Sequence, residues 1–515
     1  MPVVHHQFEA HVRNAPDAVA VVCAGKQVTY AELDVKANRF AQLLAARGHG
    51  RGAKVGVCLD YSVDMLVAIL GTLKAGAAYV PFDPAYPAAR IKQLLDQVPQ
   101  LALIVASPST APMVESAPCD VVDLQQLEGQ LAELPATAPE VTVTGDDICY
   151  AVFTSGSTGT PKLTAVRHEG WFNLMNWLKS EYGLNSGSHN LVVSAFGFDL
   201  SQRALMTPLF CGATQHLLAS RNFDAMMAYR MLTQHEIRVV HCASATLYVL
   251  IDWETARGGD ALTRLDYVLF GGEALKVERL TAWAGREGNR CTLLHQYGVA
   301  ECTDVATSFD LAGYRPGVHD IPPVGRPAYN TDIHLLGEDL RPVAAGEQGE
   351  ICIAGSSVGA GYLNNGPENA KFTTIEVDGE SRRVYRTGDR GQVNEGGDLV
   401  VLGRIDHQVK VRGMRIDPTD VERALARLDG VREAAVVVTY SDAGEAGLTA
   451  FLVPAGDGLS EDEVRAGLLT TLPRNMVPAR FLTIPRLPLS PHGKVDRVAL
   501  VESLKNQYAD SGTAA

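Results

Sequence analysis

The chain has 515 residues, of which 46% are hydrophobic, and it carries a formal net charge of −14. This length predicts about three domains or subdomains around a large buried core. The acidic balance and the lack of a lysine- or arginine-rich block argue against nucleic acid as a partner, because a sequence-independent grip on phosphates needs clustered cations.

The N-terminus has no basic stretch followed by an apolar core, and no run reaches the roughly 18 apolar residues that a membrane helix needs. We therefore expect neither secretion nor a membrane partner. The nine cysteines lie scattered from Cys23 to Cys352 without a C-x-x-C pair, which favours reduced, buried thiols and a cytoplasmic protein. The adjacent His5 and His6 are interpreted as solvated terminal residues rather than a metal or catalytic pair.

Apolar, β-rich runs alternate with helical patterns over the first 200 residues. The strand-like runs are 54–59, 79–82, 101–106 and 190–196, and the helical patterns are 64–74 and 90–96. Such alternation is typical of stacked βαβ units and a largely parallel sheet covered by helices. The first large domain is therefore predicted to be α/β. A stretch at 132–145, rich in Ala, Pro and Thr, is interpreted as a solvated connection between sheets.

A glycine- and hydroxyl-rich loop follows the apolar run 148–153. It reads Phe153-Thr154-Ser155-Gly156-Ser157-Thr158-Gly159-Thr160-Pro161-Lys162. Gly156 and Gly159 permit close backbone approach, so N–H groups, hydroxyls and one ammonium can point at a phosphate chain. The loop differs from the common G-x-x-x-x-G-K-[ST] pattern, because the second glycine and the hydroxyl after the lysine are missing. We interpret it as a nucleotide-binding loop rather than a flexible linker.

The pattern changes near residue 350 to short strands separated by glycine turns, at 351–355, 359–362, 384–389 and 399–402. This pattern predicts a small β-barrel or an antiparallel layer. Beyond it, strands at 409–412, 434–439 and 448–453 and helices at 418–428 and 460–472 predict a compact α+β unit of about 110 residues. The expected domains are 1–405 and 406–515, with the boundary at Asp406.

Several sequence blocks occur in a fixed order along the chain. Besides the loop at 153–162 they are Leu73-Lys74-Ala75-Gly76-Ala77-Ala78-Tyr79-Val80-Pro81 with Asp83-Pro84, Phe198-Asp199-Leu200-Ser201, Gly271-Gly272-Glu273-Ala274-Leu275, Gln296-Tyr297-Gly298-Val299-Ala300-Glu301, Tyr385-Arg386-Thr387-Gly388-Asp389, Gly403-Arg404-Ile405-Asp406-His407-Gln408-Val409-Lys410 and Pro491-His492-Gly493-Lys494-Val495-Asp496-Arg497. On these blocks the chain resembles an adenylation domain of nonribosomal peptide synthetases, within the adenylate-forming superfamily of acyl-CoA synthetases and luciferases, over nearly its whole length.

The resemblance implies a ligase that uses ATP and Mg²⁺. A carboxylate would attack the α-phosphorus of ATP, and catalysis would rest on positioning and on cations facing the phosphate charge. Lys494 would supply the key cation from a mobile C-terminal domain, and Glu301 would bind Mg²⁺. The implied ATP-binding residues are Thr154, Ser155, Gly156, Ser157, Thr158, Gly159, Lys162, Gly272, Glu273, Ala274, Gln296, Tyr297, Gly298, Asp389 and Arg404.

Three of these residues have more specific implied roles. Asp389 would accept hydrogen bonds from the ribose hydroxyls, Arg404 would support it, and Tyr297 would pack on adenine. Surface ion pairing is the alternative for each charge. One departure from the family pattern concerns Val299-Ala300, which stands where Pro-Thr is usual. The missing threonine hydroxyl removes one expected phosphate contact.

Asp199 narrows the implied substrate, because amino-acid-activating relatives pair this aspartate with the α-ammonium of an α-amino acid. The alternative is a helix N-cap. The resemblance places the substrate-binding residues at Asp199, Leu200, Arg203, His241, Leu269, Gly271, Gln296, Asp304, Val305 and Lys494.

Several of these pocket residues are polar, which predicts a polar substrate side chain, since a buried polar group left unpaired is costly. Homoserine- or threonine-like and Asp/Asn-like side chains rank first, and basic side chains second. Two alternatives remain open: Arg203 and Asp304 pair with each other, and His241 is a core histidine.

Only 21 residues follow Lys494, too few for a carrier-protein domain, so a free-standing enzyme is expected. It would rotate its C-terminal domain about Asp406, bring the loop at 413–415 to the active site, and load the phosphopantetheine thiol of a separate carrier protein. An MbtH-like helper protein is left open. The other hypotheses are an acyl-CoA synthetase, which Asp199 disfavours, and a non-catalytic binding protein, which Lys494, Glu301 and Asp389 disfavour.

Overall fold

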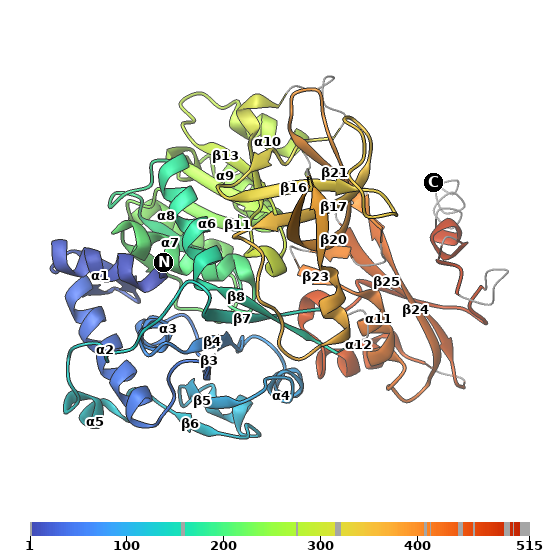
Figure 1. The fold of residues 1–515 in the computed structure, drawn as a ribbon. Coiled ribbons are helices and arrows are strands. Elements are labelled where there is room, and N and C mark those ends of the chain that lie inside the picture. The colour runs from blue at the N-terminus through green and yellow to red at the C-terminus, as the bar shows by residue number, and fades with distance from the viewer. Residues whose placement is uncertain are drawn as a thin grey trace. The chain divides into compact units, whose positions relative to one another are not determined.

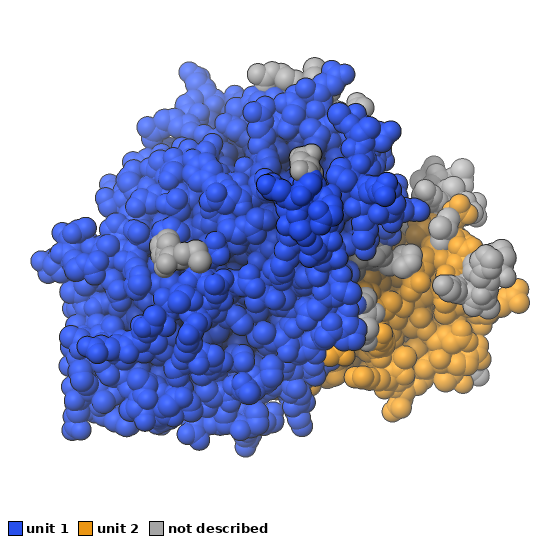
Figure 2. Space-filling model, viewed as in Figure 1, with its two compact units in different colours: residues 1–85, 91–154, 162–406 blue, residues 86–90, 155–161, 407–515 orange. Residues whose placement is uncertain are grey.

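The computed structural model describes residues 3–155, 160–273, 275, 277–314, 321–377, 379–405, 409–411, 414–440, 446–456, 459–488, 495–497 and 499–504. The chain forms two compact units, coloured separately in Figure 2: unit 1 comprises residues 1–85, 91–154 and 162–406, and unit 2 comprises residues 86–90, 155–161 and 407–515. Seven of the predicted site and hinge residues lie outside the described residues: Gly156, Ser157, Thr158, Gly159, Ala274, Asp406 and Lys494.

One sheet of unit 1 has seven strands in the order β18-β8-β7-β4-β3-β5-β6 (Figure 1). The strands are β3 (Lys54–Cys58), β4 (Ala78–Pro81), β5 (Leu101–Ala106), β6 (Asp120–Val122), β7 (Ile148–Thr154), β8 (Lys162–Arg167) and β18 (Gly361–Tyr362). The pairs from β7 to β6 are parallel, whereas β8 and β18 add antiparallel pairs at one edge. The parallel part follows the predicted βαβ alternation.

The second sheet has nine strands in the order β15-β14-β13-β12-β11-β9-β10-β1-β2. The strands are β1 (Val19–Cys23), β2 (Lys26–Thr29), β9 (Asn190–Val192), β10 (Gln215–Leu217), β11 (Val239–Ala243), β12 (Tyr267–Gly271), β13 (Thr292–Tyr297), β14 (Thr307–Asp310) and β15 (Arg326–Pro327). Its centre is parallel and both edges are antiparallel. The strand predicted at 190–196 ends at Val192, because the following residues form the loop that leads into a helix.

Helices pack on both faces of the nine-stranded sheet. The α-helices between residues 4 and 284 are α1 (Val4–Asn14), α2 (Tyr30–Ala46), α3 (Val63–Lys74), α4 (Ala88–Leu95), α5 (Glu128–Ala132), α6 (His168–Glu181), α7 (Asp199–Cys211), α8 (Ala225–Gln234), α9 (Ser244–Arg257) and α10 (Val277–Ala284). Residues of α2, α3, α6 and α7 share one core with both sheets. Residues of α8, α9 and α10 form a second core on the opposite face of the nine-stranded sheet. Burial of these apolar faces holds the layers together.

A third sheet of unit 1 is antiparallel, in the order β16-β17-β20-β19, with β21 also paired to β20. Its strands are β16 (Thr331–Leu336), β17 (Gly349–Gly355), β19 (Phe372–Val377), β20 (Glu380–Val393) and β21 (Leu399–Arg404). The antiparallel layer, one of the two forms predicted for this region, is the one observed. Its core includes Tyr297, so it is continuous with the end of β13.

Unit 2 is a smaller α+β unit with a three-stranded sheet, β24-β25-β26, and a two-stranded hairpin, β22-β23. Its elements are β22 (Val409–Val411), β23 (Met414–Ile416), α11 (Pro418–Leu425), β24 (Val431–Tyr440), β25 (Ala446–Pro454), α12 (Glu461–Leu469) and β26 (Arg480–Thr483). Asp417 accepts the backbone N–H of Thr419 and Pro418 follows it, which explains why α11 begins there. The α/β fold class predicted from the sequence is confirmed.

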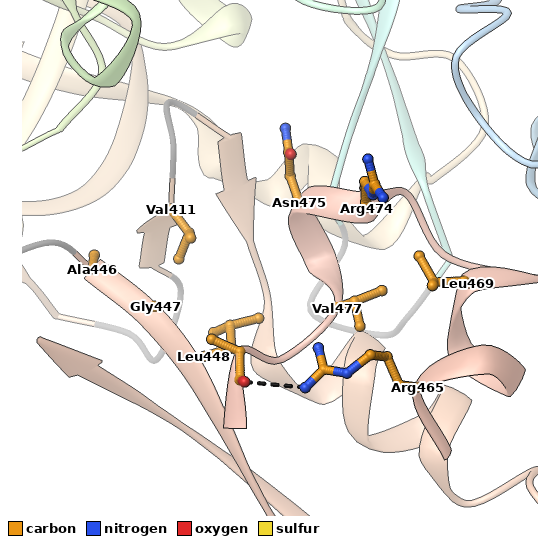
Figure 3. Close-up of a pocket in the computed structure, with 10 residues that line it drawn as sticks. Val411, Ala446, Gly447, Leu448, Arg465, Leu469, Arg474, Asn475 and Val477 are labelled. Carbon is orange, nitrogen blue, oxygen red and sulfur yellow. Dashed lines mark hydrogen bonds between the residues drawn. The ribbon is translucent and has the colours of Figure 1, made fainter. Parts of the chain in front are cut away.

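Unit 2 also contains a pocket of about 400 Å³ (Figure 3). Arg465 of α12 donates hydrogen bonds to the carbonyl oxygens of Pro478 and Ala479, each at 3.1 Å, and pairs with Glu461 at 2.7 Å. This arginine therefore ties α12 to the chain that leads into β26. The residues that line the pocket include none predicted for the site: Val411, Ala446, Gly447, Leu448, Arg465, Leu469, Arg474, Asn475, Val477 and Ala479.

Among the described residues, the structure contains no helix that is both long and apolar enough to cross a membrane.

Lys74, the lysine of the first sequence block, is buried at the end of α3. Its ammonium lies 2.5 Å from the Glu9 carboxylate and 2.9 Å from that of Asp34. These partners come from α1 and α2, so one buried cation connects three helices. Removing one partner of such a buried pair leaves an uncompensated charge, which makes the contact a strong constraint on helix position.

His5 is not solvated as the sequence suggested. It lies in the first turn of α1, is 4% exposed, and its ring centroid is 5.7 Å from that of His168. His168 begins α6 and is fully buried. Burial lowers the pKa of His168 from its usual 6.5 to about 4, and burial also holds the pKa of His5 well below its usual value. Both rings are therefore neutral at physiological pH.

These histidines predict a pH-dependent stability. Between pH 6.5 and about 4 the unfolded chain binds a proton on His168 that the folded chain does not, so stability should fall as the pH decreases through this window, by roughly 3 kcal/mol for this group. Urea unfolding midpoints at pH 7.5 and 5 measure the effect. His168→Phe should flatten the pH dependence, whereas the partly exposed control His49→Phe should not. Equal slopes for both variants would contradict this account.

Candidate active site

Four of the predicted acid-binding residues lie in the middle or at the carboxyl ends of the parallel strands β11, β12 and β13. In register, His241 lies beside Leu269, and Gly271 lies beside Gln296. A side chain at Gly271 would place its Cβ 2.1 Å from the Gln296 carbonyl oxygen, so only glycine fits this close strand approach. Open α/β sheets bind ligands at this edge, which makes it the natural location for a site.

The loop after β13 returns to the sheet through a tight turn. A Cβ at Gly298 would lie 2.0 Å from the carbonyl oxygen of Asp304. Thr303 and Asp304 are consecutive left-handed residues, with φ of 58° and 70°. Such backbone costs on the order of 1–3 kcal/mol per residue and is concentrated at functional sites. The conformation turns the Asp304 carboxylate toward α7.

Arg203 forms a buried charge cluster with Asp304 and Gln296. Its Nε lies 2.6 Å from Asp304 Oδ2, and the two atoms meet as an ion pair rather than as an aligned hydrogen bond. Its Nη1 donates a hydrogen bond to Gln296 Oε1. The Arg203 side chain is 2% exposed and that of Asp304 is 10% exposed. The pairing of Arg203 with Asp304, left open by the sequence, is therefore what the structure shows.

His241 lies on β11 next to this cluster and is completely buried. Neither ring nitrogen has a hydrogen-bond partner among the described residues. Burial holds its pKa well below the usual value, and the positive charge of Arg203 lowers it further. The ring is therefore neutral. Sequence reasoning offered a pocket residue or a satisfied core histidine, and the structure shows a core histidine whose nitrogens are not satisfied by those residues.

Asp199 is the first residue of α7 and is partly exposed. Phe198 occupies the N-cap position with extended backbone, so the N-cap alternative for Asp199 is wrong. The Asp199 carboxylate accepts the N–H of Leu200 at 2.8 Å. The buried Asp83 accepts the N–H of Gly197 at 3.3 Å and so fixes the loop before Asp199. Sequence reasoning quoted Asp83 in a block but gave it no role.

The predicted nucleotide residues form a second cluster around Asp389. The hydroxyl of Tyr297 donates to one carboxylate oxygen at 2.7 Å, and Arg404 donates to the other at 2.7 Å. Arg404 also donates to the Thr387 carbonyl at 3.1 Å. Burial raises the pKa of Tyr297 well above its usual value, and the Asp389 charge adds to this effect. Tyr297 thus acts as a hydrogen-bond donor that orients Asp389.

Glu301 is fully buried in the short helix η3 (Ala300–Cys302). One carboxylate oxygen accepts the hydroxyl of Tyr362 at 2.6 Å, and that hydroxyl lies 2.9 Å from the hydroxyl of Tyr385. A carboxylate is the hard oxygen ligand that Mg²⁺ prefers alongside substrate phosphates, so the residue type fits the implied metal. Sequence reasoning gave no role to Tyr362 or Tyr385, although Tyr362 ends the predicted strand at 359–362 and Tyr385 begins one of the quoted blocks.

Lys162 follows the predicted phosphate loop, and its side chain is buried. Its ammonium lies 3.2 Å from Glu368 of η5 (Pro367–Lys371) and 5.0 Å from the ring centroid of Tyr362. Glu368 is a partner that the sequence did not indicate. The cation therefore faces a carboxylate of its own chain, and its contact with phosphate stays a prediction.

The remaining predicted residues lie around these clusters. Thr154 ends β7, with its hydroxyl 3.4 Å from that of Thr164. Ser155 belongs to unit 2, where its hydroxyl donates to the Arg415 carbonyl at 2.9 Å. Leu269 and Val305 are buried, whereas Leu200, Gly272 and Glu273 are partly exposed.

Two family models match the chain. The model described as AMP-binding enzyme matches residues 8–363, and the model described as AMP-binding enzyme C-terminal domain matches residues 420–494. The chain belongs to the AMP-binding enzyme family. This match confirms the resemblance drawn from the sequence blocks, and the enzyme's relatives place it with the adenylation domains of the adenylate-forming superfamily.

Three similar proteins illustrate this placement. A dimodular nonribosomal peptide synthase of Bacillus subtilis is 34% identical over 96% of the chain, which spans only 21% of that relative's length. A nonribosomal peptide synthetase protein containing adenylation and PCP domains, solved with a vinylsulfonamide inhibitor, is 26% identical with a TM-score of 0.82, over 98% of this chain and 84% of that one. An o-succinylbenzoate CoA synthetase from Bacillus subtilis, 21% identical, shares the fold with a TM-score of 0.82 over 96% of this chain and 98% of that one.

The Lys162–Glu368 pair predicts a stability effect that distinguishes a structural role of Lys162 from its predicted role in binding phosphate. Lys162→Met should lower the free energy of unfolding by about 3 kcal/mol, because it leaves Glu368 facing a mostly buried site without this partner. The double variant Lys162→Met/Glu368→Gln should recover part of the loss, as measured by urea unfolding midpoints. A single variant that keeps its stability but no longer binds ATP would show that phosphate is the partner that matters.

Proposed function

We propose that the enzyme activates an α-amino acid with ATP, forms an aminoacyl adenylate and releases pyrophosphate. It then transfers the aminoacyl group to the phosphopantetheine thiol of a carrier protein, with release of AMP, in nonribosomal peptide synthesis. One observation carries the first step: Gln296 and Tyr297 are consecutive residues of β13, and they contact Arg203 and Asp389 respectively. The cluster expected to bind the acid and the cluster expected to bind the nucleotide are therefore one residue apart, as a reaction between the two requires.

In the adenylation step, a carboxylate oxygen of the amino acid bonds to the α-phosphorus while the bond to the pyrophosphate oxygen breaks. Asp389, held by Tyr297 and Arg404, would orient the ribose, and Lys494 would face the charge that develops on the phosphate. Bound Mg²⁺, held by Glu301, would neutralise phosphate charge. The protein contributes fixed positions and charges, and no side chain needs to form a covalent bond.

The preference for an amino acid rests on Asp199. A partly exposed carboxylate at the first turn of α7 suits an ammonium group, which a plain carboxylic acid lacks. The polar surroundings of Arg203, Asp304 and Gln296 favour a polar side chain, because burying them against an apolar one leaves hydrogen-bonding groups unused. An acyl-CoA synthetase shares this fold, so the fold alone does not separate the two functions.

ATP–pyrophosphate exchange with a panel of amino acids and plain carboxylic acids tests the function. Lys494→Ala should lower the exchange rate about 10²- to 10³-fold, because a cation at the reacting phosphate is lost. The exposed control Lys26→Ala should exchange normally. Exchange with plain acids but not amino acids would overturn the amino-acid assignment, and near-normal exchange by the Lys494 variant would overturn the role of that lysine. Loading of a carrier protein, compared with free coenzyme A, identifies the acceptor.

Asp199→Asn keeps the side-chain shape and removes the charge. It should raise the KM for the amino acid about 10- to 100-fold, the value of one charge-assisted hydrogen bond, and leave the KM for ATP unchanged. Initial rates at varied concentrations of each substrate separate the two constants. Asp339→Asn, an exposed change of the same kind, is the control. An equal rise in both constants would show that Asp199 supports the fold rather than the amine.

A further inference from the structure

We propose that the acid pocket of this enzyme is short and that it selects α-amino acids with a small, uncharged, hydroxyl-bearing side chain, of serine or threonine size, because Arg203 fills its deeper part. This inference rests on the proposed function and narrows the substrate. Sequence reasoning left three kinds of side chain open, namely hydroxyl-bearing, Asp/Asn-like and basic. The structure distinguishes them by size and by charge.

The size argument begins on α7. Asp199 and Arg203 are four residues apart, so they lie one helical turn from each other on the same face. An amino acid held by Asp199 therefore directs its side chain toward a volume that already contains Arg203. Arg203 is among the largest fully buried side chains of the chain.

The residues beneath Arg203 on the strands that face it are buried. His241 on β11 and Leu269 on β12 sit side by side there and are both 0% exposed. Asp199 and Leu200, one turn higher, are partly exposed. A small molecule that enters beside Asp199 and Leu200 therefore reaches no farther than Arg203. We call Arg203 the floor of the pocket. A short side chain fits above this floor, and a long one collides with it.

The floor is fixed from two sides. Arg203 reaches Gln296 on β13 and Asp304 on the left-handed loop, so moving it would break both contacts and leave the Asp304 carboxylate without this cation. Breaking a buried ion pair costs more than burial of one additional apolar side chain returns. A leucine or phenylalanine substrate therefore cannot displace Arg203.

The charge argument excludes acidic and basic side chains, whereas an uncharged Asn-like amide is distinguished from a hydroxyl-bearing side chain by its size alone. The cation of Arg203 already faces Asp304, so a substrate carboxylate would compete with Asp304, and a substrate ammonium would compete with Arg203. Either competition leaves one protein charge buried without its partner. A hydroxyl avoids this cost, because it can donate to the slightly exposed Asp304 carboxylate while the ion pair stays intact.

The experiment compares kcat/KM for ATP–pyrophosphate exchange by the wild-type enzyme across serine, threonine, alanine, asparagine, lysine, aspartate, leucine and phenylalanine. Serine or threonine should exceed asparagine and the long and charged amino acids at least about tenfold, the smallest discrimination expected for one methylene in a fitted pocket. Comparable exchange with asparagine, or with a long or charged amino acid, would overturn the inference and leave the proposed function standing. Alanine above both hydroxyl amino acids would overturn the hydroxyl assignment. Exchange with none of the amino acids would instead overturn the proposed function.

Two double variants separate size from charge. Arg203→Ala/Asp304→Ala removes both charges and the floor, so leucine and phenylalanine should gain at least about tenfold in kcat/KM relative to serine. Arg203→Met/Asp304→Leu removes both charges but keeps the volume, so long side chains should stay excluded. Thermal unfolding midpoints confirm that each variant folds. If the volume-conserving variant also gains kcat/KM for leucine and phenylalanine relative to serine, Arg203 does not act as a steric floor.

Discussion

The alternation of side chains along β13 is the constraint on which the site depends. Successive residues of a strand point to opposite faces, so Gln296 reaches the Arg203 cluster while Tyr297 reaches Asp389 of the antiparallel sheet. A single strand therefore holds the cluster predicted to bind the acid and the cluster predicted to bind the nucleotide at a fixed separation. Because that separation is built into a paired strand within a buried sheet, small movements of surface loops cannot change it.

Buried ion pairs join segments that are distant in the sequence at three places in unit 1. Lys74 joins three helices, Lys162 meets Glu368, and Arg203 meets Asp304. Such pairs add little net stability, because desolvation of both charges offsets their attraction. Their consequence is positional: any arrangement that separates the partners leaves a charge in a medium that solvates it poorly. They therefore restrict the number of packings available to the helices and loops around the site.

The sequence could predict what depends on local pattern. The strands and helices between residues 54 and 106 follow the predicted alternation of apolar strand-like runs with helical patterns. The sequence blocks also pointed to residues that the structure brings together, such as Tyr297, Asp389 and Arg404, and their binding roles stay predictions. The sequence could not predict contacts made across long separations. Glu368 is 206 residues from Lys162, and the burial of His5 depends on packing against α6. The local sequence pattern carries no information about such distant partners. His5, which is buried, was therefore interpreted as solvated.

A charged floor discriminates between substrates in a different way from an apolar one. A leucine at the position of Arg203 could change rotamer and let neighbouring side chains repack around a larger substrate, because apolar contacts are non-directional. Arg203 cannot adapt in this way, since its two partners sit on separate elements and one of them is carried by left-handed backbone. Moving Arg203 would separate its buried charge from that of Asp304. The free energy that this separation costs does not diminish as the substrate becomes larger. Rejection of large side chains by this pocket is therefore an electrostatic property as much as a steric one.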